Sequence, residues 1–152
     1  MNRLVDIIRS VLISPEMLCL LLPIGIWTYW PGPFQFVTTQ VYADFKWGIG
    51  AALVPAGFFA SSYNLGTDLL SPHGARKVLL EWPDYWMIKN RVVMAVIFCG
   101  VAVFVVVFAL YLIAESKASL GAALLLSGWL SAFAALCSVG LARWKTREIL
   151  GE

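Results

Sequence analysis

Residues 92–141 read VVMAVIFCGVAVFVVVFALYLIAESKASLGAALLLSGWLSAFAALCSVGL. Neither 92–114 nor 118–141 contains a charged residue, and only Glu115, Ser116 and Lys117 separate the two stretches. At the helical rise of 1.5 Å per residue, 92–114 measures about 34 Å, which is enough to cross a hydrocarbon core of about 30 Å. We therefore predict two membrane-spanning helices that return on each other through a minimal turn.

The composition supports a membrane protein. The chain of 152 residues is 61% hydrophobic and 13% charged, whereas about a quarter of the residues of ordinary soluble domains are charged. Two further apolar stretches occupy 15–30 and 47–63. The sequence thus predicts an all-α integral membrane protein, a single membrane domain over 1–152 with four transmembrane helices. The first of them, at about 24 Å, is short for a bilayer.

The N-terminal segment predicts two elements. Residues 1–13 place apolar side chains on one helical face and Arg3, Asp6 and Arg9 on the other, which is typical of an amphipathic helix lying in the headgroup layer. Ser14, Pro15 and Glu16 then form a helix start: a hydroxyl cap, a proline at the first position and an acid favoured by the helix dipole. A coupled transporter needs an acid inside the membrane, but we interpret Glu16 as a helix-start residue at the membrane surface.

The basic residues predict the orientation. If all four stretches span, nine of the eleven Lys and Arg residues fall on one side, and Lys46 and Lys117 on the other. Basic residues are enriched in cytoplasmic segments. We therefore expect a protein of the cytoplasmic (inner) membrane with an outer loop at 31–46, a partly helical cytoplasmic loop at 64–91 and a cytoplasmic tail at 142–152, so that both termini lie in the cytoplasm. Pro83 and Asp84 open a helix that we expect to continue into the third span.

Small residues recur every fourth position on two of the expected spans. They are Gly48, Ala52, Ala56 and Ala60 on the second, and Ser127, Ser131 and Ala135 on the fourth. Small side chains let helix backbones approach closely in lipid. These residues are therefore predicted contacts of a homo-oligomer, and the two stripes are also candidate contacts for each other.

The loop at 64–91 contains aromatic and charged residues side by side. We predict that Arg76, Lys77, Trp82, Asp84, Tyr85 and Trp86 bind a soluble cytoplasmic protein, because Trp, Tyr and Arg are enriched at interface hot spots. The same composition also suits an anchor in the headgroup layer, where aromatic and basic residues meet anionic lipid.

No sequence pattern predicts chemistry. The chain has no nucleotide-binding, zinc or nucleophile motif, so we expect no catalytic residues, no metal and no cofactor. The net charge of +2 comes from the cytoplasmic segments and predicts no direct nucleic-acid binding. An enzyme acting on lipid would have to use His73, Glu81 or Asp84.

Three hypotheses of function remain open. The first is a non-enzymatic membrane protein that self-associates and recruits or regulates a cytoplasmic partner, as the membrane component of a multi-subunit system such as anti-phage defence. The second is an oligomeric pore, holin-like or an effector, lined by Ser127, Ser131 and Ser138. The third is a small transporter subunit.

Overall fold

The computed structural model describes residues 14–43, 45–70, 81–82, 85–115 and 117–150. Its elements are α2 (Pro15–Tyr29), α3 (Gly32–Ala43), α4 (Phe45–Leu70), α5 (Tyr85–Ala114) and α6 (Ala118–Leu150). All of these elements are α-helices, so the predicted all-helical class is confirmed for the part of the chain that is described. The expected interfacial helix at 1–13 lies outside it.

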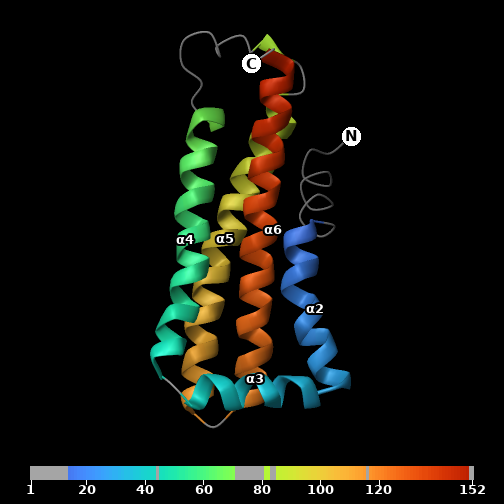
Figure 1. The fold of residues 1–152 in the computed structure, drawn as a ribbon. Helices are drawn as coiled ribbons and strands as arrows, with labels where there is room; N and C mark the ends of the chain where they lie inside the picture. The colour runs from blue at the N-terminus through green and yellow to red at the C-terminus, as the bar shows by residue number, and fades with distance from the viewer. Residues whose placement is uncertain (1–13, 44, 71–80, 83–84, 116, 151–152) are drawn as a thin grey trace.

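The hairpin of α5 and α6 forms the centre of the fold (Figure 1). A Cβ atom built on Gly121 would lie 2.8 Å from the carbonyl oxygen of Ala109, and one on Gly128 would lie 3.0 Å from that of Ala102. The two backbones therefore approach each other more closely than any side chain at these glycines would permit. Helix α5 begins at Tyr85 and, as expected, runs without a break through the third apolar stretch; the expected opening residues Pro83 and Asp84 lie outside the described residues.

Helix α4 lies along this hairpin and is fastened to it at both ends. Near its start, the indole Nε1 of Trp129 donates a hydrogen bond of 2.9 Å to the carbonyl of Ala51. Near its end, the hydroxyl of Tyr85 donates one of 2.7 Å to the carbonyl of Leu69. Between these points the core holds mostly small side chains of α5 and α6, including Ala95, Cys99, Ala102, Ala132 and Ala135.

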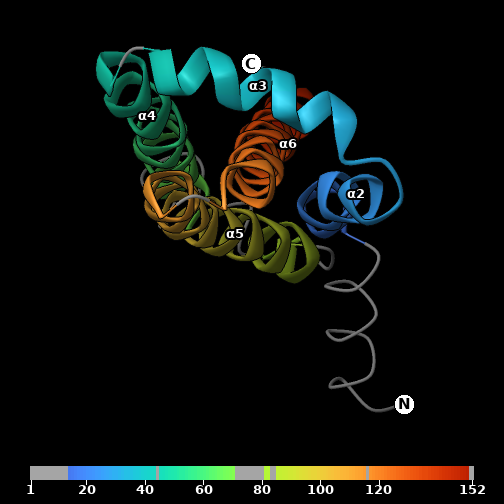
Figure 2. The ribbon, with the colours of Figure 1, turned by 90° about the horizontal axis from the view of Figure 1, so that it is seen from below.

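Helices α2 and α3 form a bent pair. The chain turns by 108° between them, so that α2 lies beside α6 and α3 crosses the end of the bundle (Figures 1 and 2). Phe34 of α3 packs against Ala122 and Ala123 of α6, with Trp27 of α2 beside them. The segment expected as an outer loop at 31–46 is thus largely helical, because its apolar residues find a protein surface to cover.

Among the described residues, two helices, α5 and α6, are long and apolar enough to cross a membrane, and the count rises to three if α2 and α3 together form one bent span. Helix α4 is not among them: its second half contains Ser61, Ser62, Tyr63 and Asn64. Large apolar side chains such as Phe104, Phe108 and Leu130 point outward, as expected for helices surrounded by lipid. The structure therefore supports a membrane protein with two or three clear spans.

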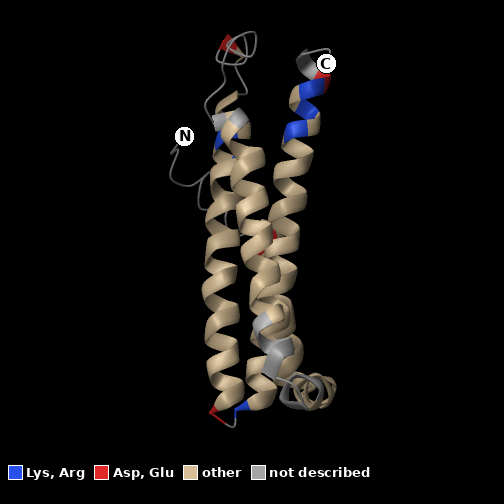
Figure 3. Ribbon diagram, turned by 60° about the vertical axis from the view of Figure 1, so that its left-hand side comes forward, with Lys and Arg blue, Asp and Glu red and all other residues tan. Residues whose placement is uncertain are grey.

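Charged residues lie mainly toward the ends of the bundle (Figure 3). Five basic residues lie in the first turns of α5 and the last turns of α6: Lys89, Arg91, Arg143, Lys145 and Arg147. We call this the basic end. The opposite end carries α3, the start of α4 with Lys46, and the turn between α5 and α6 with Glu115 and Lys117.

Candidate functional site

The start of α2 has the expected cap. Ser14 has an extended backbone, and its hydroxyl accepts a hydrogen bond of 3.1 Å from the N–H of Met17. Pro15 follows at the first helical position, where its missing N–H removes no helical hydrogen bond. The predicted helix start is confirmed.

The Glu16 side chain, in contrast, does not face a surface. It is only 1% exposed, and both of its carboxylate oxygens accept hydrogen bonds of 3.1 Å from Nη2 of Arg91. The hydroxyl of Ser138 donates to its Oε1, and Nη2 of Arg91 also lies 3.3 Å from that hydroxyl. We call Glu16, Arg91 and Ser138 the Glu16 cluster. Our interpretation of a surface acid is wrong for this side chain, because residues of α5 and α6 cover it.

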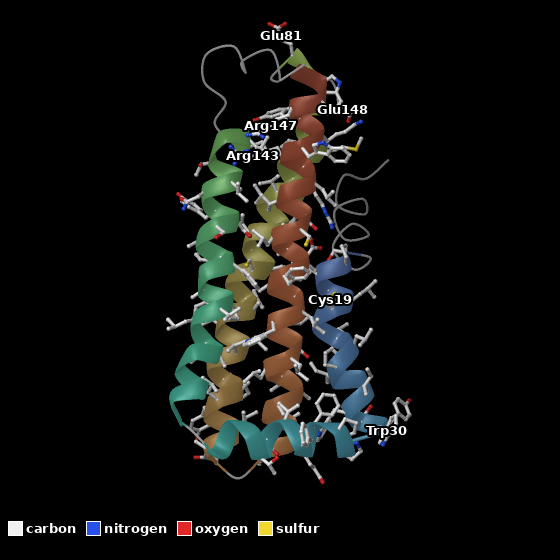
Figure 4. All side chains as sticks on the ribbon, viewed as in Figure 1. Cys19, Trp30, Glu81, Arg143, Arg147 and Glu148 are labelled. Atoms are coloured by element: carbon white, nitrogen blue, oxygen red, sulfur yellow. The ribbon has the colours of Figure 1, made fainter. Side chains whose placement is uncertain are left out.

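Exposed tryptophans indicate the depth of the Glu16 cluster. Trp30, Trp86 and Trp144 all face outward, and Trp30 lies at the corner between α2 and α3 (Figure 4). Trp30 follows Glu16 by 14 residues, about 21 Å of helix, and Trp144 follows Ser138 by six, about 9 Å. Because Glu16 touches Ser138, the two tryptophans lie about 30 Å apart along the bundle, the thickness of a hydrocarbon core.

Tryptophan is enriched at both membrane interfaces, so this spacing is typical of two aromatic belts. By this measure the Glu16 cluster lies about 9 Å inward from the belt at the basic end. Trp86 gives a consistent result, since it precedes Arg91 by five residues, about 8 Å. Along the bundle, the ion pair thus lies about 8–9 Å inward from the exposed tryptophans of the basic end.

The contacts of the cluster join three helices. Glu16 belongs to α2, Arg91 to α5 and Ser138 to α6. A buried carboxylate loses its hydration and is tolerated only when an opposite charge and hydrogen bonds replace the water. The cluster therefore fastens the start of α2 to the central hairpin. Among the described residues no group of three or more His, Cys, Asp and Glu side chains lies together.

The serines of α6 point into the protein. Ser127 and Ser131 are fully buried within a single chain, and Ser127 donates to the carbonyl of Ala123 in its own helix. Ser131 Oγ is buried without a hydrogen-bond partner, as is Nε1 of Trp27 on α2. None of these groups faces an open passage through the described chain.

The predicted oligomer contacts separate into two sets. On α6, Ser127, Ser131 and Ala135 are fully covered inside one chain, so packing between helices of the same chain accounts for their small size. On α4, Ala52 and Ala56 are half-buried and Ala60 is exposed, while the surroundings of Gly48 lie outside the described residues. Contact with a second copy stays a prediction for both sets.

The predicted partner-binding residues also separate. Arg76, Lys77 and Asp84 lie outside the described residues, Trp82 is half-buried and Trp86 is exposed. Tyr85 is buried, and its hydroxyl donates a hydrogen bond to the carbonyl of Leu69, so it connects α4 and α5. Figure 4 shows Glu81 at this end, and Arg143 and Arg147 on the last turns of α6.

Trp144 was not singled out from the sequence, Ser138 was named only as a candidate pore-lining residue, and neither Arg91 nor Ser138 was paired with Glu16. A signal for the pair existed: Glu16 is the only acid in the first apolar stretch, and Arg91 directly precedes the third. Both positions were expected near the same face of the membrane. No protein-family model matches the chain, and comparison with curated proteins and with solved structures gave no match.

Proposed function

We propose that the protein is a non-enzymatic component of the cytoplasmic membrane that presents its 71–84 loop to a soluble cytoplasmic partner. In this proposal α2, α4, α5 and α6 all cross the membrane, and the basic end faces the cytoplasm. Five basic residues at that end against Lys46 and Lys117 at the other support this orientation through the usual enrichment of Lys and Arg on the cytoplasmic side.

One observation carries the proposal. The hydrogen bond of 2.7 Å between the Tyr85 hydroxyl and the Leu69 carbonyl joins the helix before the loop to the helix after it. The two helices that flank the segment with Arg76, Lys77, Trp82 and Asp84 are therefore held together where that segment begins and ends. Binding residues are commonly found on loops that a rigid scaffold positions.

The interior of the bundle favours the docking hypothesis and argues against a pore formed within one chain. Gly121 and Gly128 bring the backbones of α5 and α6 into contact, and Ser127 and Ser131, two of the three candidate pore-lining serines, are buried. Trp86, at the level of the belt, suits a lipid anchor better than a partner contact. We therefore assign partner binding chiefly to Trp82 and its charged neighbours, and self-association through α4 remains part of the proposal.

Copurification from detergent tests the proposal. The full chain is captured from its host membrane, and the bound proteins are identified by mass measurement of the intact complex. Replacing Trp82 with alanine should remove a soluble partner, because truncating an aromatic hot spot costs about 2 kcal/mol or more, about thirtyfold in affinity. The matched control is Trp30→Ala, an exposed tryptophan at the opposite end. Equal loss in both variants, or loss in neither, contradicts docking at the loop.

A small transporter subunit is the second candidate, and the buried position of Glu16 favours it. Coupled transporters use acids inside the membrane, which a surface position would have excluded. The ion pair with Arg91 argues for a structural role of Glu16 instead, because its carboxylate already has a counter-ion. Replacing Glu16 with glutamine distinguishes the two: it should abolish proton-driven transport in vesicles if Glu16 couples transport, and leave partner capture intact if the protein docks.

A further inference from the structure

Arg91 uses only part of its hydrogen-bonding capacity inside the bundle. A guanidinium carries five N–H donors, two on each Nη and one on Nε. All described hydrogen bonds of Arg91 start from Nη2, which reaches Glu16 and Ser138. In the described part of the chain, Nη1 and Nε of Arg91 have no hydrogen-bond partner. Neither atom is buried, and 36% of the Arg91 side chain is exposed. The guanidinium therefore presents an edge of N–H donors at the surface of the bundle.

This edge lies close to the level of the lipid headgroups. Arg91 is about 8 Å inward from Trp86 along α5, a distance over which long basic side chains extend back toward the interface. The 15 residues of α2 measure about 22 Å, about 8 Å less than a hydrocarbon core. A span that is too short thins the bilayer around it, and this draws headgroups toward the start of α2, where Glu16 meets Arg91.

The cluster also fixes the orientation of the guanidinium. Glu16 and Ser138 hold Nη2 from inside the bundle, so the side chain cannot turn its remaining donors inward. N–H donors left against lipid chains cost free energy until an acceptor reaches them. At this depth the abundant acceptor is the phosphodiester of a phospholipid, and its oxygens match the planar N–H pair of a guanidinium.

We propose that the Nε and Nη1 edge of Arg91 binds the phosphate of a phospholipid in the leaflet at the basic end, beside the start of α2. Because Glu16 already neutralises Arg91, hydrogen bonding carries the recognition and long-range charge contributes little. The site therefore selects lipids that carry a phosphate over lipids that lack one. This inference does not depend on the identity of any protein partner.

Native mass spectrometry of the full chain in detergent tests the site. The protein is titrated with phosphatidylglycerol and, separately, with a diacylglycerol of the same acyl chains. We expect one phosphatidylglycerol to be retained about fivefold more tightly, the ratio that corresponds to about 1 kcal/mol, the usual net contribution of a hydrogen bond. Arg91→Lys keeps a positive charge for Glu16 but loses the planar fork, so it should lose this preference. Lys145→Gln removes a basic residue of the same end that is exposed and paired with Glu148, so it should keep the preference.

The melting temperature of Arg91→Lys shows whether the variant folds. If it does not fold, the double variant Glu16→Gln, Arg91→Gln replaces it, because two neutral amides of similar shape can bond to each other. Equal retention of both lipids by the wild type overturns the site, and so does an unchanged preference in the folded variant. Displacement of the lipid by equimolar inorganic phosphate also overturns it, because the ligand is then a soluble anion.

Discussion

Nη2 of Arg91 and the carboxylate of Glu16 lie 3.1 Å apart although 75 residues separate them in the chain. This pair joins the start of α2 to the hairpin of α5 and α6, and the Glu16 side chain is buried there. An ion pair in such surroundings is most sensitive to the loss of one partner, because the other charge is then left without a counter-ion.

Replacing Arg91 with alanine should therefore destabilise the protein strongly. Loss of one partner of a buried pair costs about 3–5 kcal/mol, and we expect the lower end because Arg91 is partly exposed. Reversible unfolding in mixed micelles measures the change in free energy. The double variant Glu16→Gln, Arg91→Gln should lose less than Arg91→Ala alone. Arg147→Ala, at an exposed position, should change the free energy by less than about 0.5 kcal/mol. A double variant that is less stable than Arg91→Ala would show that the charge pair itself is favourable.

Two serines on the same helix should respond differently to alanine. Ser138 donates to Glu16, and a hydrogen bond between membrane helices contributes about 0.6 kcal/mol on average and up to about 1.7. Ser138→Ala should therefore lower the free energy of unfolding by about 1 kcal/mol. The buried Ser131 hydroxyl has no partner, so Ser131→Ala should be neutral or stabilising, since it removes an unsatisfied polar group. Equal losses in the two variants would mean that Ser131 has a partner, such as a bound water.

The contact between α5 and α6 predicts a contrast between glycines. A Cβ on Gly128 would lie 2.5 Å from Cγ2 of Val106 and 3.0 Å from the Ala102 carbonyl oxygen. Gly128→Ala should thus separate the helices and cost about 1–3 kcal/mol. Gly57 of α4 has no atom within 4 Å of such a Cβ, so Gly57→Ala should be tolerated, with up to about 1 kcal/mol gained from helix propensity. Thermal unfolding in detergent measures both, and similar behaviour of the two variants would contradict the close α5–α6 contact.

Labelling of single cysteines tests the proposed orientation. Glu81 and Glu148 are exposed at the basic end, and Thr39 is exposed on α3 at the other end. In intact cells a membrane-impermeant maleimide should react with Thr39→Cys from outside, and with Glu81→Cys and Glu148→Cys only after the membrane is opened. Thr38, the neighbouring position, is unsuitable because its side chain is buried. Reaction of Glu81→Cys from outside would overturn both the orientation and docking in the cytoplasm.

Local features of the chain were readable from the sequence. The uncharged stretches at 92–114 and 118–141 and the three residues between them predict the hairpin of α5 and α6, because hydrophobicity, length and a short turn act through neighbouring residues. The start of α2 at Pro15 follows in the same way from the hydroxyl of Ser14, which bonds to the N–H of Met17. The helical form of 32–43 was missed, because its apolar residues suit a headgroup layer as well as the end of a bundle.

Only the tertiary structure decided which residues meet. Glu16 and Ser138 are 122 residues apart, and no periodicity within α2 or α6 indicates that their side chains share a depth and a direction. The same holds for Tyr85 and Leu69, whose hydrogen bond closes the base of the loop, and for the serines of α6, which the packing of neighbouring helices turns inward. A membrane span is determined by the transfer of its own side chains into lipid, whereas a contact between spans depends on the rotation and register of two helices at once. The sequence therefore determined the class of protein and most helix positions, and the packing of the helices determined the site.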